Sequence, residues 1–186
     1  MKRSAILALF ACLIIAPSAR SARKGGSHGL SYSVSFGLGA GKPRSDEFSS
    51  GFGTGFGAVL DVGLRMSIVE ILADFDYGFY FNSTIEPLDA NTLNTFLMLK
   101  VKPFDWAFSP YALAGGGYYR YWVVNADLYE GAAGAAAGGG VEAKIGEKQR
   151  LFVEGKYVVG RTRRANPSKA NTESLVGRVG LTWIIE

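Results

Sequence analysis

Two carboxylates, Asp74 and Asp76, have the clearest potential for chemistry, because they lie two positions apart in a segment that alternates between polar and apolar residues. In an extended strand such a pair shares one face, where two carboxyl groups can act as general acid and general base. Basic residues fall on the same face of the predicted strands, which favours an ion-pair network over catalysis. We expect this network, structural or gating, to contain Asp61, Arg65, Glu70, Asp74, Asp76, Lys100, Lys102, Arg120, Glu142, Lys144, Glu154, Lys156 and Arg178.

Other kinds of active site find little support. A serine hydrolase needs a histidine base beside its nucleophile, and the only histidine, His28, precedes the first predicted strand. The sequence has no cluster of His and Cys for a metal, and carboxylate spacing alone is a weak signal. We therefore expect no catalytic residue, no metal site and no cofactor.

The charged residues must be positioned by β-strands. From Ser31 to Gly41 every even position is apolar and every odd position is Ser or Gly, which is typical of a strand with two different faces. The alternation recurs along the chain, and outside the N-terminal leader no segment has a helical period. The eight expected strands cover residues 31–41, 51–66, 68–81, 93–102, 111–123, 135–145, 151–159 and 175–185.

The orientation of the two faces distinguishes two kinds of eight-stranded barrel, a soluble calyx with an apolar interior and a membrane barrel with an apolar exterior. One face carries charges of both signs among many of the 25 glycines, whereas the other carries aromatic side chains too bulky for a small interior. We therefore predict an all-β, eight-stranded, antiparallel, up-and-down transmembrane β-barrel. In its first strand Tyr32, Val34, Phe36 and Leu38 should meet lipid, and Ser31, Ser33, Ser35, Gly37 and Gly39 should line the lumen.

The fifth and sixth strands have less polar faces. In the fifth we expect Tyr111, Leu113, Tyr119, Tyr121 and Val123 to point outward and Ala112, Ala114, Gly116 and Arg120 inward. Small residues expected on the outside, Gly115, Gly117, Ala135, Ala137 and Gly139, would form a stripe, which we interpret as a hypothetical packing interface for another protein.

The connections are expected to alternate in length, as in outer-membrane barrels with short periplasmic turns and long surface loops. The long ones are predicted around residues 42–50, 82–92, 125–133 and 161–172, and the shorter ones around residues 67, 103–109 and 146–150.

The N-terminus reads as a cleavable signal peptide, because Lys2 and Arg3 precede an apolar run too short to span a bilayer. Small residues allow cleavage after Ser18 or after Ser21, and the single cysteine, Cys12, lies within this leader. The predicted organisation is a signal peptide over 1–21, a flexible lead-in over 22–29 and an outer-membrane barrel domain over 30–186.

Two stretches carry a family resemblance. Ser-Pro-Tyr-Ala-Leu-Ala-Gly-Gly-Gly-Tyr from Ser109 to Tyr118 resembles a strand opening of the small outer-membrane β-barrel proteins, which include opacity-type proteins and OmpA-like transmembrane domains. Residues 138–142 followed by 151–157 are similar to the hairpin between the sixth and seventh strands of that family. The resemblance implies the bacterial outer membrane as location, lipid and lipopolysaccharide as surroundings, and the barrel assembly machinery as partner.

A binding role is expected in the loops. Arg161, Arg163, Arg164 and Lys169 form the one clear charge cluster, which could contact lipopolysaccharide phosphates or an anionic host surface. The net charge of +4 is otherwise scattered, which argues against nucleic-acid binding. The expected function is that of a monomeric structural or surface-interacting barrel with a plugged, charge-lined lumen. The alternatives are a small gated pore and a soluble periplasmic calyx that binds lipophiles.

Overall fold

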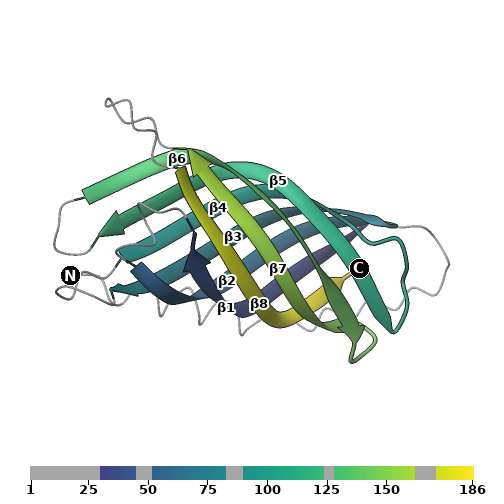
Figure 1. The fold of residues 1–186 in the computed structure, drawn as a ribbon. Coiled ribbons are helices and arrows are strands. Elements are labelled where there is room, and N and C mark those ends of the chain that lie inside the picture. Colours follow the sequence, from purple (N-terminus) through teal and green to yellow (C-terminus); the bar gives the residue numbers. More distant parts are fainter. Residues whose placement is uncertain (1–29, 45–51, 83–89, 124–127, 162–170) are drawn as a thin grey trace, which may run out of the picture.

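The strands form one closed antiparallel barrel in which each strand pairs with its neighbours in the sequence and β8 pairs with β1 (Figure 1). The computed structural model describes residues 30–44, 52–82, 90–123, 128–161 and 171–186, so the predicted signal peptide and lead-in lie outside the described residues. The strands are β1 (Ser31–Pro43), β2 (Phe52–Met66), β3 (Val69–Asn82), β4 (Ala90–Val101), β5 (Phe108–Val123), β6 (Leu128–Lys144), β7 (Gln149–Arg161) and β8 (Asn171–Ile185). The predicted fold class is confirmed.

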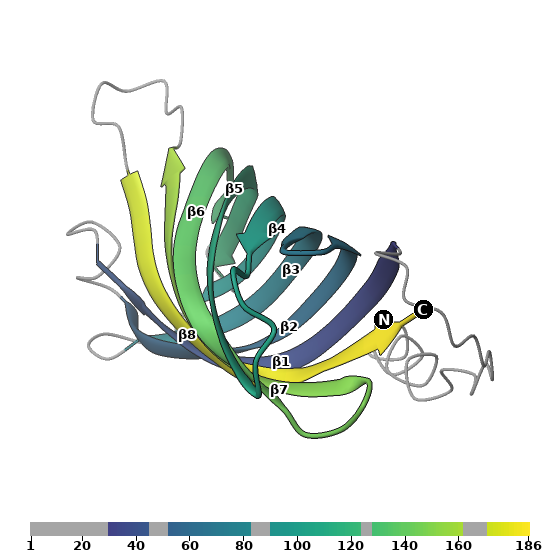
Figure 2. The same ribbon diagram turned by 90° about the vertical axis from the view of Figure 1, so that its right-hand side faces the viewer.

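The pairing of β1 with β8 is the seam that closes the barrel (Figure 2). Its register places Ser35 opposite Thr182, and their hydroxyl oxygens lie 2.8 Å apart in a buried hydrogen bond. Outside the barrel the same seam pairs Val34 with Trp183. A polar contact inside and an apolar pair outside therefore mark the same register.

The outer wall is apolar and the interior is polar. Leu38, Phe56 and Leu97 are each more than 60% exposed, whereas Ser33, Asp74 and Lys156 are almost completely buried. This arrangement is the opposite of a calyx, whose apolar side chains would face inward. In the part of the chain that is described, no helix is long and apolar enough to cross a membrane.

The connections alternate in length less regularly than predicted. β2 and β3 are joined by a tight turn at Ser67, whose φ of 54° lies in the left-handed region used by such turns. The fifth connection was expected over 125–133, but β6 begins at Leu128 and the connection spans only 124–127. It is shorter than the fourth, over 102–107, because residues 128–133, expected in the connection, continue β6. We call the end of the barrel with the first, third, fifth and seventh connections the loop end, and the opposite end the turn end.

The predicted faces of β5 are wrong. Tyr111, Leu113 and Tyr119 are at most 6% exposed and face the lumen, whereas Ala112 and Ala114 are exposed on the outside. The reason is volume, because the inward side chains of β5 join an apolar lumen cluster that fills space which charged residues alone do not occupy. The cluster consists of Leu72, Phe96, Met98, Tyr111, Leu113, Tyr119, Ala136 and Val158.

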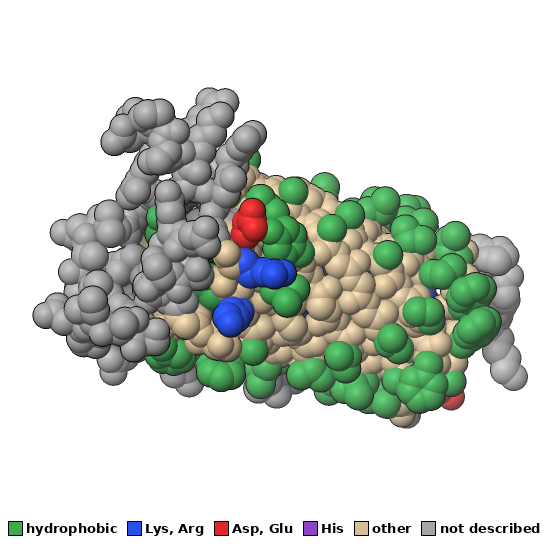
Figure 3. Space-filling view, viewed as in Figure 1, with side chains coloured by type: hydrophobic (Ala, Val, Ile, Leu, Met, Phe, Trp, Pro, Cys, Tyr) green, Lys and Arg blue, Asp and Glu red, His purple; other side chains and the backbone are tan. Residues whose placement is uncertain are grey.

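The prediction of small outward residues is correct for Ala135, Ala137 and Gly139 on β6 and wrong for the two glycines of β5. Gly115 and Gly117 lie on the lumen side of β5, close to Met98 and Phe96. A row of small residues instead crosses five strands on the outer wall, and it consists of Ala112, Gly139, Gly155, Gly177 and Ala40 in successive register. In the face seen in Figure 3, hydrophobic side chains surround a central area of backbone and small residues, and most charged side chains gather beside the loop end.

Glycines on the lumen side allow bulky neighbours to lie flat against the wall. A Cβ on Gly115 would lie 2.1 Å from the carbonyl oxygen of Leu97 and 2.7 Å from Sδ of Met98. A Cβ on Gly155, which faces outward on β7, would meet nothing within 4 Å. An added methyl group would therefore clash at Gly115 but not at Gly155, although both glycines lie within strands.

This contrast predicts unequal effects of the same substitution. Gly115→Ala should lower the free energy of unfolding by about 1–3 kcal/mol, because the new methyl group overpacks the wall against Met98. Gly155→Ala, the matched control, should leave stability within about 0.5 kcal/mol of the wild type. Urea unfolding of the refolded protein in detergent, followed by tryptophan fluorescence, measures both. Equal effects of the two substitutions would contradict the packing argument.

Candidate functional site: the charged lumen

Side chains from four strands meet in the middle of the lumen. Nζ of Lys156 donates to both carboxylate oxygens of Asp74, at 2.8 and 2.9 Å, and also contacts Asp76. Nη1 of Arg178 donates to Oδ2 of Asp74 at 2.7 Å and lies 3.4 Å from Asp76. We call the following group the central cluster: Asp61, Asp74, Asp76, Glu154, Lys156 and Arg178.

Arg178 is the hub of the central cluster. Its guanidinium group contacts Asp61 on β2, Asp74 and Asp76 on β3, and Glu154 on the adjacent β7. The side chains of Arg178 and Lys156 are completely buried, so both cations depend on these carboxylates to replace water. Removing one partner of such a buried ion pair typically lowers the free energy of unfolding by about 3–5 kcal/mol, because the remaining charge is left unpaired. The cluster therefore connects opposite sides of the barrel across its lumen.

A second group of charges lies nearer the turn end. Glu142 on β6 accepts hydrogen bonds from Lys100 and from Lys102, the latter at 2.7 Å, and Nε of Arg150 lies 3.9 Å from it. Lys100 also lies 3.7 Å from Glu70, which accepts a hydrogen bond from Ser33. We call the following group the turn-end cluster: Ser33, Glu70, Lys100, Lys102, Glu142 and Arg150.

Tyr111 joins the two clusters. Its hydroxyl group donates to Oε2 of Glu154 in the central cluster at 3.0 Å. Nζ of Lys100 in the turn-end cluster lies 4.1 Å from the centre of its ring, a cation–π contact. A residue expected to face lipid is therefore the link between the two halves of the network.

At the turn end, Asp105 in the connection between β4 and β5 reaches over the barrel opening. It accepts a hydrogen bond from Arg150 at 2.9 Å, lies 3.2 Å from Nζ of Lys144, and lies 3.5 Å from Arg65. Partial burial raises the pKa of Asp105, but the hydrogen bonds from Lys144 and Arg150 outweigh it and lower the pKa to about 2. Because its partners belong to β2, β6 and β7, Asp105 ties the connection across the opening.

Most predicted network residues lie together, with specific exceptions. Arg65 and Lys144 lie at the turn end and contact Asp105 rather than the buried clusters. Arg120 pairs in register with Leu93, so it lies on the outward parity of β5 and not in the lumen network, which corrects the prediction. The sequence analysis did not include Asp105 and Arg150 in the predicted ion-pair network. The alternation of β7 could have revealed Arg150, but a turn residue such as Asp105 has no periodic signal.

Only part of the predicted anion contact lies within the described residues. Arg163, Arg164 and Lys169 lie outside the described residues, and Arg161 is the last residue of β7. The strand ends beside this connection are described. Lys42 and Arg44 are exposed at the end of β1, and the backbone N–H of Arg44 donates to the carbonyl oxygen of Glu173 at 2.8 Å. Two exposed cations therefore lie at the base of the basic connection, at positions that the sequence analysis assigned to the first connection.

Comparison with known proteins identifies the fold of the chain only. No protein-family model and no curated protein sequence matches it.

Solved structures do match. Neisserial surface protein A (NspA) superposes with a TM-score of 0.66 at 20% sequence identity, covering 83% of this chain and 98% of that one. Ail, the attachment invasion locus protein of Yersinia pestis, superposes with a TM-score of 0.54 at 12% identity over 83% of this chain and 98% of its own. A second Ail structure, with the same TM-score and identity, holds the heparin analogue sucrose octasulfate. The chain thus has the fold of the small bacterial outer-membrane β-barrels, as the resemblance implied.

The lowered pKa of Asp105 predicts a specific pH dependence. Its stabilising contribution is complete above the ordinary value of 3.8 and is lost as the pH falls through about 2, because the unfolded chain takes up the proton first. The difference in unfolding free energy between the wild type and Asp105→Asn should therefore shrink as the pH falls from about 5 to about 2. Urea unfolding of both proteins across this range measures it. A difference that stays constant would show that Asp105 is not held by its basic partners.

Proposed function

We propose that this protein is an integral outer-membrane barrel with a closed lumen that acts at the cell surface through its loop end. The observation that carries the proposal is the sorting of side chains, with an apolar wall outside and paired charges inside. An apolar exterior suits insertion into lipid, and an eight-stranded lumen is narrow enough for side chains to fill. The protein is therefore a stable platform for its surface connections.

The central cluster supports closure of the lumen. Arg178 and Lys156 lie between carboxylates of β2, β3 and β7, so an ion crossing the barrel would have to separate these pairs. The apolar cluster, contributed by β3 to β7, fills the lumen beside them. Opening would require buried charges to lose their partners, at the cost estimated above for such pairs.

Planar bilayers test this closure. The wild-type protein should give no large, stable pore. Arg178→Ser should give more frequent openings that favour cations, because it removes the hub and leaves four carboxylates facing a single lysine. Lys148→Ser is the matched control, since Lys148 pairs with Glu186 at the exposed turn end. Stable open pores of the wild type would favour the alternative function of a gated pore.

For the loop end we propose contact with an anionic surface ligand, in the first place the phosphates of lipopolysaccharide. Arg161 at the end of β7 and Arg163, Arg164 and Lys169 in the seventh connection supply the charge. Lys42 and Arg44 extend this basic region onto the outer wall, at the level where lipid headgroups meet a barrel. The sulfated heparin analogue bound by Ail is an independent example of a polyanion on this fold.

Charge removal tests this contact. The double substitution Arg163→Ala and Arg164→Ala should weaken lipopolysaccharide binding by roughly thirtyfold, at about 1 kcal/mol for each charge lost. The control, Lys144→Ala with Lys148→Ala, removes the same charge from the turn end and should leave binding unchanged. Binding of labelled lipopolysaccharide to the purified protein in detergent measures both. Equal losses in the two variants would indicate an effect of net charge alone and would reject the loop-end contact.

A further inference from the structure

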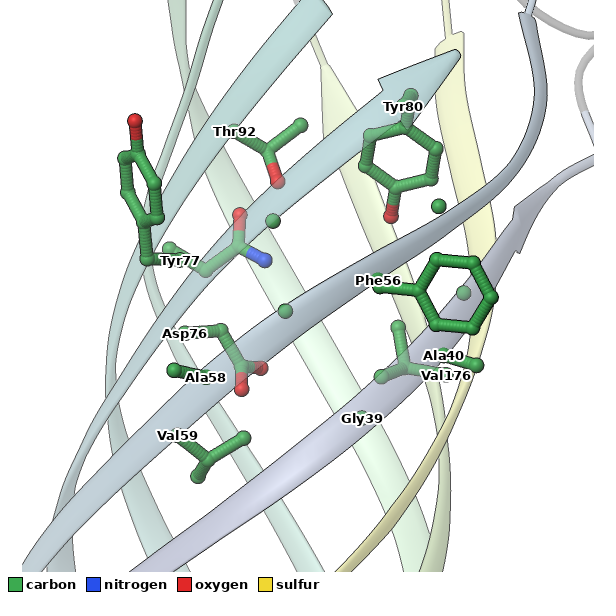
Figure 4. A pocket seen from close by; sticks show the side chains of 15 residues that line it. Gly39, Ala40, Phe56, Ala58, Val59, Asp76, Tyr77, Tyr80, Thr92 and Val176 are labelled. Carbon is green, nitrogen blue, oxygen red and sulfur yellow. The ribbon is translucent and has the colours of Figure 1, made fainter.

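The lumen contains a small cavity whose lining does not suit a charged ligand. The cavity has a volume of about 20 Å³ and lies on the side of β1 to β4, towards the loop end (Figure 4). Its lining is mostly glycine and apolar side chains such as Val59 and Val176. Asp76, the charged residue of this lining, already contacts Lys156 and Arg178. Donors without a full set of partners lie instead at the turn end.

Three basic side chains converge on one carboxylate at the turn end. Asp105 is contacted by Arg65 of β2, Lys144 of β6 and Arg150 of β7, which we call the mouth cations. Arg65 and Arg150 approach its Oδ1 atom, at 3.5 and 2.9 Å, and Lys144 approaches its Oδ2 atom at 3.2 Å. Because three strands position charged donors around one carboxylate, the opening has the geometry of an oxyanion site.

The Asp105 carboxylate does not satisfy all the donors of Arg150. Nη2 of Arg150 donates to Asp105, but Nε and Nη1 are buried and donate to no residue that the structure describes. Nε lies 3.9 Å from Glu142, which is too far for a hydrogen bond. Leaving a buried charged donor without a partner is costly. A carboxylate has two oxygens, whereas a phosphate has four, so a phosphate offers acceptors for more of these N–H groups.

The charge of the turn end also favours an anion. Five cations and three carboxylates are joined by the contacts described there: Arg65, Lys100, Lys102, Lys144 and Arg150 with Glu70, Glu142 and Asp105. Lys102 is buried inside the opening, and this burial lowers its pKa to about 8. Glu142 opposes the shift, whereas the positive charges of Arg65 and Arg150 lower the pKa of Lys102 further. An excess of two positive charges therefore lies around the opening that Asp105 covers.

Asp105 is the exposed partner in this site. Its side chain is 58% exposed and belongs to the connection over 102–107, whereas the mouth cations are held by strands. The side chain of Arg150, in contrast, is only 6% exposed. Rotation of the Asp105 side chain would therefore vacate the site without breaking any strand pairing.

We propose that the opening at the turn end binds a small phosphate-type oxyanion, which replaces the Asp105 carboxylate on the mouth cations. Asp105 is an internal competitor that fills the site when the anion is scarce. Arg150 and Lys102 lie inside the opening, so a free anion reaches them, whereas a lipid headgroup stays at the outer wall. Short turns of outer-membrane barrels face the periplasm, so the ligand is a periplasmic anion. The site is separate from the basic region at the loop end.

Phosphate binding to the refolded protein tests the proposal. Asp105→Asn removes the competing charge and should bind inorganic phosphate about tenfold more tightly than the wild type, as expected if the wild-type site is vacant about a tenth of the time. Phosphate is titrated in a detergent without phosphate groups, and chloride holds the ionic strength constant so that surface screening stays equal. Broadening of the phosphorus-31 NMR line and the rise of the urea midpoint with phosphate measure binding.

Two double variants separate the site from general effects of charge. Asp105→Asn with Arg150→Gln removes the buried donors and should abolish the tighter binding. Asp105→Asn with Lys148→Ser is the matched control and should keep it, since Lys148 pairs with Glu186 outside the site. If the variant with Arg150→Gln does not fold, Lys144→Ala on the Asp105→Asn background replaces it and should also weaken binding, because Lys144 is a partly exposed mouth cation.

Several outcomes would overturn the proposal. These are absence of phosphate binding to Asp105→Asn, equal binding to Asp105→Asn and the wild type, and equal losses in the two double variants. Acetate that competes as well as phosphate would overturn the assignment of a phosphate-type anion. Phosphatidylglycerol added to the micelles should leave phosphate bound, and its displacement of phosphate would overturn the assignment of a free anion in favour of a lipid headgroup.

Discussion

Shortage of space inside an eight-stranded barrel governs the rest of this structure. Several bulky inward side chains lie across a neighbouring strand at a position where that strand carries glycine. The ring of Tyr111 lies over Gly140, and the ring of Phe152 lies over Gly37 and Gly180. The same confinement leaves little water for charges, so Arg178 and Lys156 must be neutralised by carboxylates from other strands. Packing and electrostatics are therefore two results of one geometric constraint.

This constraint divides the lumen into unequal halves. β4, β5 and β7 fill their side with Phe96, Tyr119 and Val158, while β1 to β3 present glycines and leave a cavity. The central cluster lies between the two halves, with Lys156 5.8 Å from the ring centre of Phe96 on the filled side and Asp76 on the hollow side. A lumen built only from ion pairs would lack the apolar volume that holds these charges at fixed distances.

The sequence was sufficient where charge marked the inward face. In β3, β7 and β8 the alternation of Asp74, Lys156 and Arg178 with apolar neighbours correctly predicted both the strands and their orientation. β5 lacked such a marker, because one of its faces is small and the other aromatic, and its single charge, Arg120, belongs to the outer face. Aromatic residues suit both a lipid interface and a packed interior, so alternation alone cannot orient such a strand.

The contacts of the network were harder to predict than its members. Alternation places Glu154 and Arg178 on inward faces but does not give the height at which each strand crosses the barrel, which depends on the stagger between strands. Tyr111 and Asp105 illustrate the limit, because a long-range contact joins Tyr111 to Glu154 and a turn brings Asp105 to Arg150. Such contacts depend on three-dimensional register, which periodicity in one strand does not contain.

The seam between β1 and β8 has a consequence for assembly. It joins the two ends of the chain, so it closes the longest loop in the molecule and carries the greatest entropic cost of any strand pair. A shift of one residue there would turn Arg178 towards lipid and Trp183 into the lumen. Both placements are energetically unfavourable, so a barrel closed in the wrong register would be unstable. The hydrogen bond between Ser35 and Thr182 requires the correct register of the last strand, because a shift of one residue would turn one of the two hydroxyl groups outward.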